Sequence, residues 1–147
     1  MVIALFGESC TGKSTLADAL KKEFNAEVYT GRDYLRFAKG EREAREAFRA
    51  MLAAAKEPVV YVISEKELLD LLPKNCVRVL VTADISLIKE RFAKRMGGKL
   101  PPPVAAMLEK KHGAFDGEPH DLHVRGGEDD SSEALAQIRR LLASRSA

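Results

Sequence analysis

A run of eight residues near the N-terminus constrains this chain more than any other feature. Residues 7–14 read Gly7-Glu8-Ser9-Cys10-Thr11-Gly12-Lys13-Ser14 and follow an uninterrupted apolar stretch at residues 1–6. This is the G-x-x-x-x-G-K-[ST] pattern of a phosphate-binding loop, which is credible between a buried strand and a helix. The apolar stretch predicts that strand, and apolar residues at helical spacing over residues 14–24 predict the helix. The pattern therefore indicates a strand, loop and helix that bind a nucleoside triphosphate.

Each fixed position of the loop has a physical role. Glycines at positions 7 and 12 permit backbone angles that a Cβ atom hinders, so that successive amides can point at an anion. These amides lie at the start of a helix, where the helix dipole also favours phosphate oxygens. We expect Lys13 to place its ammonium on the outer phosphates of ATP and the Ser14 hydroxyl to hold Mg²⁺. The predicted nucleotide-binding residues are Gly7, Glu8, Ser9, Cys10, Thr11, Gly12, Lys13, Ser14 and Thr15.

Length and charge narrow the classes of protein that the chain can belong to. At 147 residues it is expected to form a single domain over residues 1–147. The net charge is +2 with both signs interleaved, so the balance favours neither a nucleic-acid partner nor an anionic membrane. The chain has no apolar stretch of membrane-spanning length and no basic leader before the first apolar run. We therefore expect a cytoplasmic protein whose partners are small molecules.

The rest of the chain alternates strand-like and helical patterns. Strands are predicted at residues 26–30, 59–63, 77–81 and 122–124, and helices at residues 33–39, 41–56, 65–72, 85–96, 104–115 and from 131 or 132 onward. This alternation predicts a five-stranded parallel sheet between two layers of helices, a three-layer α/β/α sandwich of the P-loop NTPase fold. Ligands should gather at the carboxyl ends of the strands. The Gly- and Pro-rich segment around residues 96–104 is either a short lid or a connector.

A second polar segment, Thr30-Gly31-Arg32-Asp33-Tyr34-Leu35-Arg36, leaves the second predicted strand on the same side as the phosphate loop. It resembles the Thr-Gly-Asp-x-Leu-Arg segment of nucleoside monophosphate kinases of the adenylate kinase type, with Arg32 as an added residue. The resemblance implies a nucleotide kinase-like fold in which Thr30 and Arg36 contact the acceptor nucleotide. Arg32 and Asp33, which lie within the same segment, are assigned to acceptor binding with them.

The segment from Asp84 to Arg95 is similar to the arginine-bearing helix that leads into the lid of these kinases and of shikimate kinase. The resemblance implies that Arg91 and Arg95 reach the transferring phosphate, a role that suits the planar, permanently charged guanidinium. The alternative is a solvated helix face. After the third strand the chain carries Ser64-Glu65-Lys66-Glu67 in place of the Asp-Gly-Phe-Pro-Arg of adenylate kinases or the triple glycine of shikimate kinase. Glu65 either replaces the acidic residue that assists the metal or opens a helix.

The chemistry of the acceptor separates two functions. A phosphate acceptor is already ionised at neutral pH and needs only arginine clamps, whereas a hydroxyl acceptor needs a carboxylate to take its proton. Asp33 is the candidate base, and alternatively reaches Mg²⁺ through water. We predict a kinase that uses ATP and Mg²⁺, with Lys13, Asp33, Arg91 and Arg95 as catalytic residues and Ser14 and Asp33 at the metal. A nucleoside monophosphate is the first choice of acceptor; a hydroxyl metabolite, or nucleotide binding without transfer, is the alternative.

Two further features are open to more than one interpretation. Lys110-Lys111-His112 is interpreted as the solvated end of a helix, with the entrance for an anionic ligand as the alternative. Cys10 is interpreted as a small residue that fills the phosphate loop, with a redox switch as the alternative.

Overall fold

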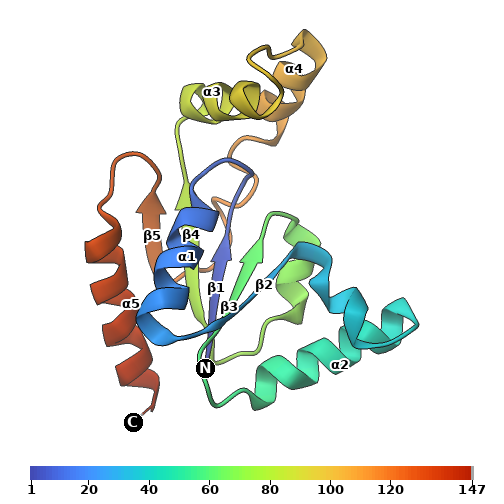
Figure 1. The fold of residues 1–147 in the computed structure, drawn as a ribbon, viewed down its shortest axis with the longest axis vertical. Coiled ribbons are helices and arrows are strands. Elements are labelled where there is room, and N and C mark those ends of the chain that lie inside the picture. The colour runs from blue at the N-terminus through green and yellow to red at the C-terminus, as the bar shows by residue number, and fades with distance from the viewer. Residues whose placement is uncertain (147) are drawn as a thin grey trace.

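Five parallel strands form one central sheet in the computed structural model, which describes residues 1–146 (Figure 1). The strands lie in the order β2-β3-β1-β4-β5. Their bounds are β1 Val2–Phe6, β2 Glu27–Thr30, β3 Val59–Ile63, β4 Val77–Thr82 and β5 Leu122–Arg125. β1 lies in the centre because it is apolar at every position and buried on both faces. The predicted five-stranded parallel sheet is confirmed.

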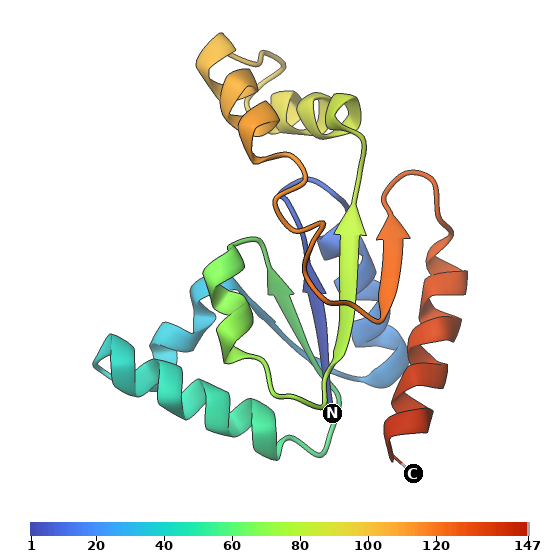
Figure 2. The same cartoon turned by 180° about the vertical axis from the view of Figure 1, so that it is seen from behind.

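Helices cover both faces of the sheet, as Figures 1 and 2 show from opposite sides. Ile3 and Leu5 of β1 face the core beneath α1 (Lys13–Phe24) and α5 (Ser131–Ser146). Their neighbours in β1 face a second core beneath α2 (Glu41–Ala54) and two short 3₁₀ helices, η1 (Gly31–Phe37) and η2 (Lys66–Leu71). This is the predicted three-layer sandwich. Within residues 1–146 no helix has both the length and the apolar character that crossing a bilayer would need.

Two helices, α3 (Ile85–Arg95) and α4 (Pro102–Lys111), project beyond the carboxyl ends of the strands (Figures 1 and 2). They form the α3–α4 unit, which has a small core of its own in which Ile88 and Leu108 pack with Cys10. The segment around residues 96–104, predicted as either a short lid or a connector, is mainly the connection between the two helices. Its closure as a lid stays a prediction. α4 begins at Pro102 rather than at residue 104, because a proline in the first turn loses no helical hydrogen bond.

The helices predicted at residues 33–39 and 65–72 are 3₁₀ helices instead, and the first begins two residues early. At η1 the Asp33 carboxylate accepts a hydrogen bond from the Thr30 amide at 2.8 Å, which closes a capping box. Gly31 has a φ of +45° and Arg32 has non-helical backbone angles, so the chain turns too tightly for an α-helix. η2 is confined to one short stretch between β3 and Pro73.

Phe48 of α2 lies fully buried at the centre of a cluster of rings. Its ring centroid is 5.0 Å from that of Tyr61 and 5.1 Å from that of Phe37, with both pairs close to edge-on. Tyr29 and Tyr34 complete the cluster, which fixes α2 and η1 on β2 and β3. The cluster therefore holds the predicted acceptor-binding segment on the sheet.

We expect Phe48→Ala to lower the free energy of unfolding by about 3–5 kcal/mol, because it leaves a cavity at the centre of this cluster. Leu35→Ala is the control: Leu35 lies in the neighbouring η1 with 43% of its surface exposed and should change stability by less than about 1 kcal/mol. Urea denaturation followed by circular dichroism measures both. An equal decrease in the free energy of unfolding in the two variants would contradict the central position of Phe48 in the cluster.

Candidate functional site

The phosphate loop connects β1 to α1 at the carboxyl edge of the sheet. A Cβ atom on Gly7 would lie 2.1 Å from the carbonyl oxygen of Val81, and Gly12 has a φ of +106°, so neither position accepts a larger residue without strain. Gly12 is also the N-cap of α1, and in the described part of the chain no side chain caps the first turn of that helix. The amides at the start of α1 are therefore open to an anionic ligand, as the motif predicts.

Lys13 is buried beneath the loop, with 5% of its surface exposed. Its ammonium donates hydrogen bonds to the carbonyl oxygens of Gly7, at 2.7 Å, and of Glu8. Burial lowers the pKa of Lys13 to about 8; the nearby groups of Cys10 and Glu8 act in the opposite direction, and the positive charge of Arg95 adds to the lowering. The ammonium thus sits at the loop with a pKa that a bound phosphate can raise.

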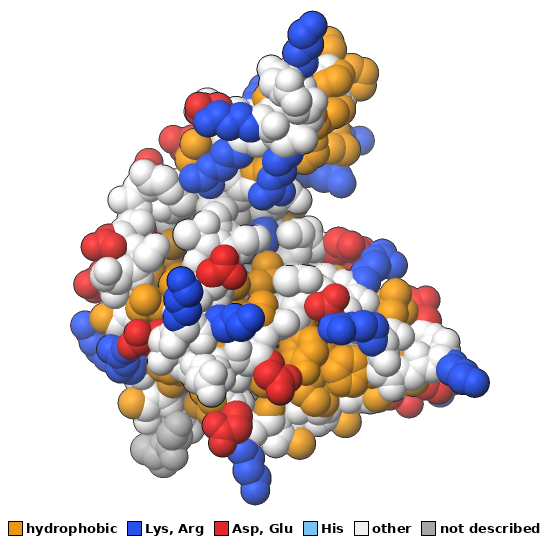
Figure 3. All heavy atoms as spheres, in the orientation of Figure 1, with side chains coloured by type: hydrophobic (Ala, Val, Ile, Leu, Met, Phe, Trp, Pro, Cys, Tyr) orange, Lys and Arg blue, Asp and Glu red, His pale blue; other side chains and the backbone are white. Residues whose placement is uncertain are grey.

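Two arginines of α3 face the same loop. Arg91 donates a hydrogen bond from Nη1 to the carbonyl oxygen of Cys10 at 3.0 Å. Arg91 and Arg95 line a cleft of about 310 Å³, the phosphate cleft, together with Ser9, Cys10, Gly12, Lys13, Ser14, Thr15, Val62 and Ser64. Figure 3 shows an indentation between the α3–α4 unit and the sheet body, with Lys and Arg side chains along the overhanging edge. The structure therefore brings both predicted arginines to the predicted nucleotide-binding loop.

The donors in this cleft suit Mg²⁺ when a nucleotide is present. Ser14 and Ser64 supply hydroxyl oxygens, and Mg²⁺ prefers such hard oxygen ligands together with phosphate oxygens and water. Within residues 1–146 no group of three or more His, Cys, Asp or Glu side chains is arranged to hold a metal ion. A cation here would therefore depend on the phosphates that it accompanies.

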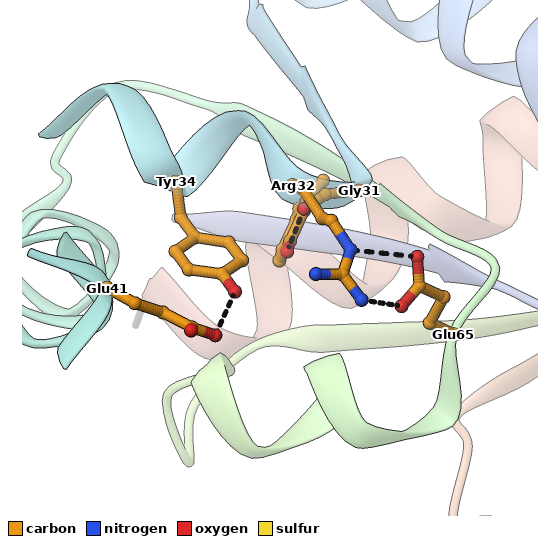
Figure 4. Close-up of polar contacts among 6 residues, drawn as sticks. Gly31, Arg32, Tyr34, Glu41 and Glu65 are labelled. Carbon is orange, nitrogen blue, oxygen red and sulfur yellow. Dashed lines mark hydrogen bonds and ion pairs between the residues drawn. The ribbon is translucent and has the colours of Figure 1, made fainter.

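The four residues predicted to bind the acceptor lie at the end of β2 and in η1, and they are engaged with protein groups. Asp33 caps η1 and forms an ion pair with Arg36 at 3.6 Å. Arg32 binds Glu65 through two hydrogen bonds, Nη2 to Oε2 at 3.0 Å and Nε to Oε1 at 3.3 Å (Figure 4). This bond lowers the pKa of the Glu65 carboxyl and raises that of Arg32. Thr30 lies at the N-cap of η1.

The carboxyl ends of β2 and β3 are tied together by this pair and by a second bond, in which the Tyr61 hydroxyl donates to the Gly31 carbonyl oxygen at 2.7 Å. As far as residues 1–146 show, none of Thr30, Arg32, Asp33 and Arg36 lines the phosphate cleft. Their assignment to the acceptor stays a prediction.

A larger cleft of about 510 Å³ opens between the phosphate loop and the α3–α4 unit, and we call it the acceptor-side cleft. It meets the phosphate cleft at Ser9 and Ser64, which line both. Its other lining residues are Glu8, Glu65, Lys66, Glu67, Ile88, Phe92, Met107, Leu108, Lys111, Ala114 and Phe115. The wall that comes from the two projecting helices is therefore mainly apolar, with Lys111 as its charged residue, while the opposite wall carries carboxylates and Lys66.

The loop after β5 follows one of the strand ends at which ligands were expected to gather, but none of its residues was predicted from the sequence to be part of the site. A Cβ atom on Gly126 would lie 1.9 Å from the carbonyl oxygen of Thr11, so this loop packs directly on the phosphate loop. Together with Thr15 and Arg91, Gly126 and Gly127 line a hollow of about 120 Å³ beside the start of α1. Two adjacent glycines directly after a strand were the available signal.

Comparisons with known proteins support this fold. No protein-family model and no curated protein sequence matches the chain. The YorR protein of Bacillus subtilis, solved in complex with phosphorylated GDP, matches with a TM-score of 0.67 and 22% identity over 97% of this chain and 96% of that one. Shikimate kinase from Acinetobacter baumannii, solved with shikimate, matches with a TM-score of 0.65 and 16% identity over 97% and 93%.

A gluconokinase from Sinorhizobium meliloti 1021 is similar with a TM-score of 0.58 and 19% identity over 99% of this chain and 91% of that chain. All three identities are below 25%, so the likenesses establish the fold, a P-loop α/β/α sandwich. The activity of this chain has to be argued from its own site.

We expect Gly126→Ala to destabilise the protein by about 1–3 kcal/mol or more, because its methyl group would collide with the backbone of the phosphate loop. Gly117→Ala is the matched control, since among the described residues other than its two chain neighbours no atom lies within 4 Å of the added Cβ there. Thermal denaturation in the presence and absence of ADP measures both stability and nucleotide binding. If both variants have the same melting temperature as the parent protein, the two loops do not approach each other this closely.

The lowered pKa of Lys13 predicts how nucleotide affinity changes with pH. A bound phosphate favours the charged ammonium, so above pH 8 the protein must take up a proton when it binds ADP. We expect the dissociation constant for ADP to rise by up to about tenfold per pH unit above pH 8 and to be nearly constant close to pH 7. Calorimetry in buffers of different ionisation enthalpy should show this uptake at pH 9. Lys13→Arg, which stays charged, should lose it.

Proposed function

We propose that the protein is a phosphotransferase that uses ATP and Mg²⁺ and moves the γ-phosphoryl group to a small acceptor. The observation that carries this proposal is the meeting of two clefts: Lys13, Arg91 and Arg95 surround the phosphate loop, and the acceptor-side cleft opens directly beside it. Phosphoryl transfer needs positive groups around the transferring phosphate and a site that places the acceptor in line with it. Both requirements are supported by residues of this chain.

The positive groups have separable roles. Lys13 neutralises the outer phosphates, while Arg91 and Arg95 stabilise the charge that spreads over the transferring group. Ser14 and Ser64 would hold Mg²⁺, which supplies further charge neutralisation at the phosphates when it is bound. α3 delivers both arginines from the projecting unit, and its contact with Cys10 keeps Arg91 at the loop.

A nucleoside monophosphate is the acceptor that the sequence resemblance favours. The supporting residues are Thr30, Arg32, Asp33 and Arg36, and the similar YorR protein was solved with a phosphorylated nucleotide. In this structure Arg32 is bound to Glu65 and Arg36 to Asp33, so an acceptor phosphate would have to replace these carboxylates. A hydroxyl metabolite is the alternative, because the similar shikimate kinase and gluconokinase act on such compounds by name. Nucleotide binding without transfer is the third possibility.

Purified protein should form ADP from ATP and Mg²⁺ only when a suitable acceptor is added. We propose to test AMP, GMP, CMP and UMP against shikimate, gluconate and glycerol, with ADP measured by a coupled assay and the phosphorylated acceptor by mass spectrometry. Lys13→Ala should lower the rate by about 100-fold or more, because it removes the charge at the transferring phosphate. Lys22→Ala, on the exposed side of the same helix, should keep the parent rate.

Tight nucleotide binding without transfer to any acceptor would favour the regulatory alternative. Full activity of a folded Lys13→Ala variant would refute the placement of the site.

A further inference from the structure

Glu8, the second residue of the phosphate loop, carries a carboxylate at the junction of two clefts. It lines the acceptor-side cleft beside Ser9, and it also lines a separate cleft of about 290 Å³ that contains His112. Only 12% of its side chain is exposed, so the charge is largely withdrawn from water. A carboxylate in such a place disfavours phosphate binding unless other groups compensate for its charge. Its presence therefore needs a physical explanation.

His112, at the end of α4, fixes the orientation of this carboxylate. Its Nδ1 lies 3.0 Å from Oε1 of Glu8. An ionised carboxylate can only accept, so Nδ1 carries the hydrogen and the imidazole acts as the donor. Within residues 1–146 no protein group bonds to Oε2, the second carboxylate oxygen. One oxygen of Glu8 is therefore anchored, and the other is available to a ligand.

Glu8 is also close to the group that would bind the outer phosphates. Its own carbonyl oxygen accepts a hydrogen bond from the Lys13 ammonium, and its charge raises the pKa of Lys13 against the effect of burial. Its side chain lines the acceptor-side cleft, which meets the phosphate cleft at the next residue, Ser9. A proton acceptor for the attacking group is needed at that place.

Two other carboxylates near the site, those of Asp33 and Glu65, have different roles. Asp33, the base that the sequence predicts, accepts the Thr30 amide and pairs with Arg36, and it does not line either cleft as residues 1–146 show them. Glu65 is held by two hydrogen bonds from Arg32. Among these three, Glu8 alone combines a position in the phosphate loop with an oxygen that has no protein partner within residues 1–146.

We propose that Glu8 is the catalytic base of this transferase and that its acceptor is a hydroxyl compound with an apolar face rather than a nucleoside monophosphate. This inference rests on the proposed function. The acceptor oxygen forms a bond to the γ-phosphorus of ATP while the bond to the β,γ-bridging oxygen breaks, and that electron pair leaves with ADP. The hydroxyl proton passes to Glu8, which later releases it to water. His112 is a positioning residue that anchors Oε1.

The walls of the acceptor-side cleft support this class of acceptor. Ile88, Phe92 and Leu108 offer an apolar surface for a carbon-rich face of the ligand. A nucleoside monophosphate could pair its phosphate with Lys66 or Lys111, which also line this cleft, but a phosphate dianion brought close to the Glu8 carboxylate would be repelled. A neutral hydroxyl avoids this repulsion and gives the carboxylate a proton to accept.

The experiment compares the two acceptor panels described above and then uses the best hydroxyl acceptor found. Glu8→Gln should lower kcat by about 100- to 10,000-fold, the usual contribution of a general base, with the dissociation constant for ADP changed by less than about threefold. Glu8→Asp is the second variant and is used if Glu8→Gln fails to fold. It keeps the negative charge but moves the carboxylate oxygen back from the cleft, and it should lower kcat by up to about 100-fold. Glu90→Gln, an exposed glutamate of α3, should keep the parent rate.

The role of His112 is tested by comparing a substitution that removes its hydrogen-bond donor with one that restores a donor. His112→Ala should lower kcat with little change in KM for the acceptor, and His112→Asn should restore most of the loss because its amide can donate in place of Nδ1. A purely structural role would instead show equal loss of stability and no difference in kcat between the two variants.

Three outcomes would contradict the inference. Transfer only to nucleoside monophosphates would refute the hydroxyl acceptor and leave the proposed function standing, whereas no transfer to either panel would refute both. If Asp33→Asn removes transfer while Glu8→Gln retains it, Asp33 is the base and Glu8 is not.

Discussion

The close approach of Gly7 to Val81 is the constraint on which the site depends. The added Cβ of any other residue would lie 2.1 Å from the Val81 carbonyl oxygen, and the Gly7 amide donates to the carbonyl oxygen of Ile63 at 3.2 Å. The chain is therefore fixed between the ends of β3 and β4 as it leaves β1. This position directs the loop over the carboxyl edge of the sheet and sets where α1 can begin. The amides at the start of α1 thus face the clefts that the other loops surround.

The phosphate loop and the α3–α4 unit are joined by packing and hydrogen bonds. Cys10, a non-glycine residue with a φ of +66°, packs its side chain into the small core of Ile88 and Leu108, while its carbonyl oxygen accepts from Arg91. At the other end of the unit, His112 bonds to Glu8. Any displacement of α3 or α4 must change these contacts, so the loop and the projecting helices are expected to respond to ligands together. The buried, apolar surroundings of Cys10 agree with its interpretation as a residue that fills the loop.

The sequence predicted those features that local patterns determine. The strand, loop and helix around residues 7–14, the order of strands and helices and the three layers follow from motif spacing and apolar periodicity, and the structure confirms them. The 3₁₀ form of η1 accompanies the left-handed φ of Gly31 and the non-helical backbone angles of Arg32, which periodicity does not report. The bonds from Arg32 to Glu65 and from His112 to Glu8 join residues 33 and 104 positions apart. Only the three-dimensional arrangement of the loops brings such pairs together, so sequence patterns could not assign them.

Charge pairing after the strands explains why the nucleotide half of the site was easier to predict than the acceptor half. Phosphate binding here uses backbone amides, whose direction is set by the fold and by the glycines at positions 7 and 12. The acceptor half uses side chains, and the exposed pair of Arg32 and Glu65 is held by only modest energy in water. A ligand carboxylate or phosphate could replace Glu65 at Arg32 at small cost, whereas Glu8 is anchored in a sheltered place by His112. The fixed carboxylate, rather than the exchangeable arginine, therefore sets the chemistry that an acceptor must meet beside the phosphate loop.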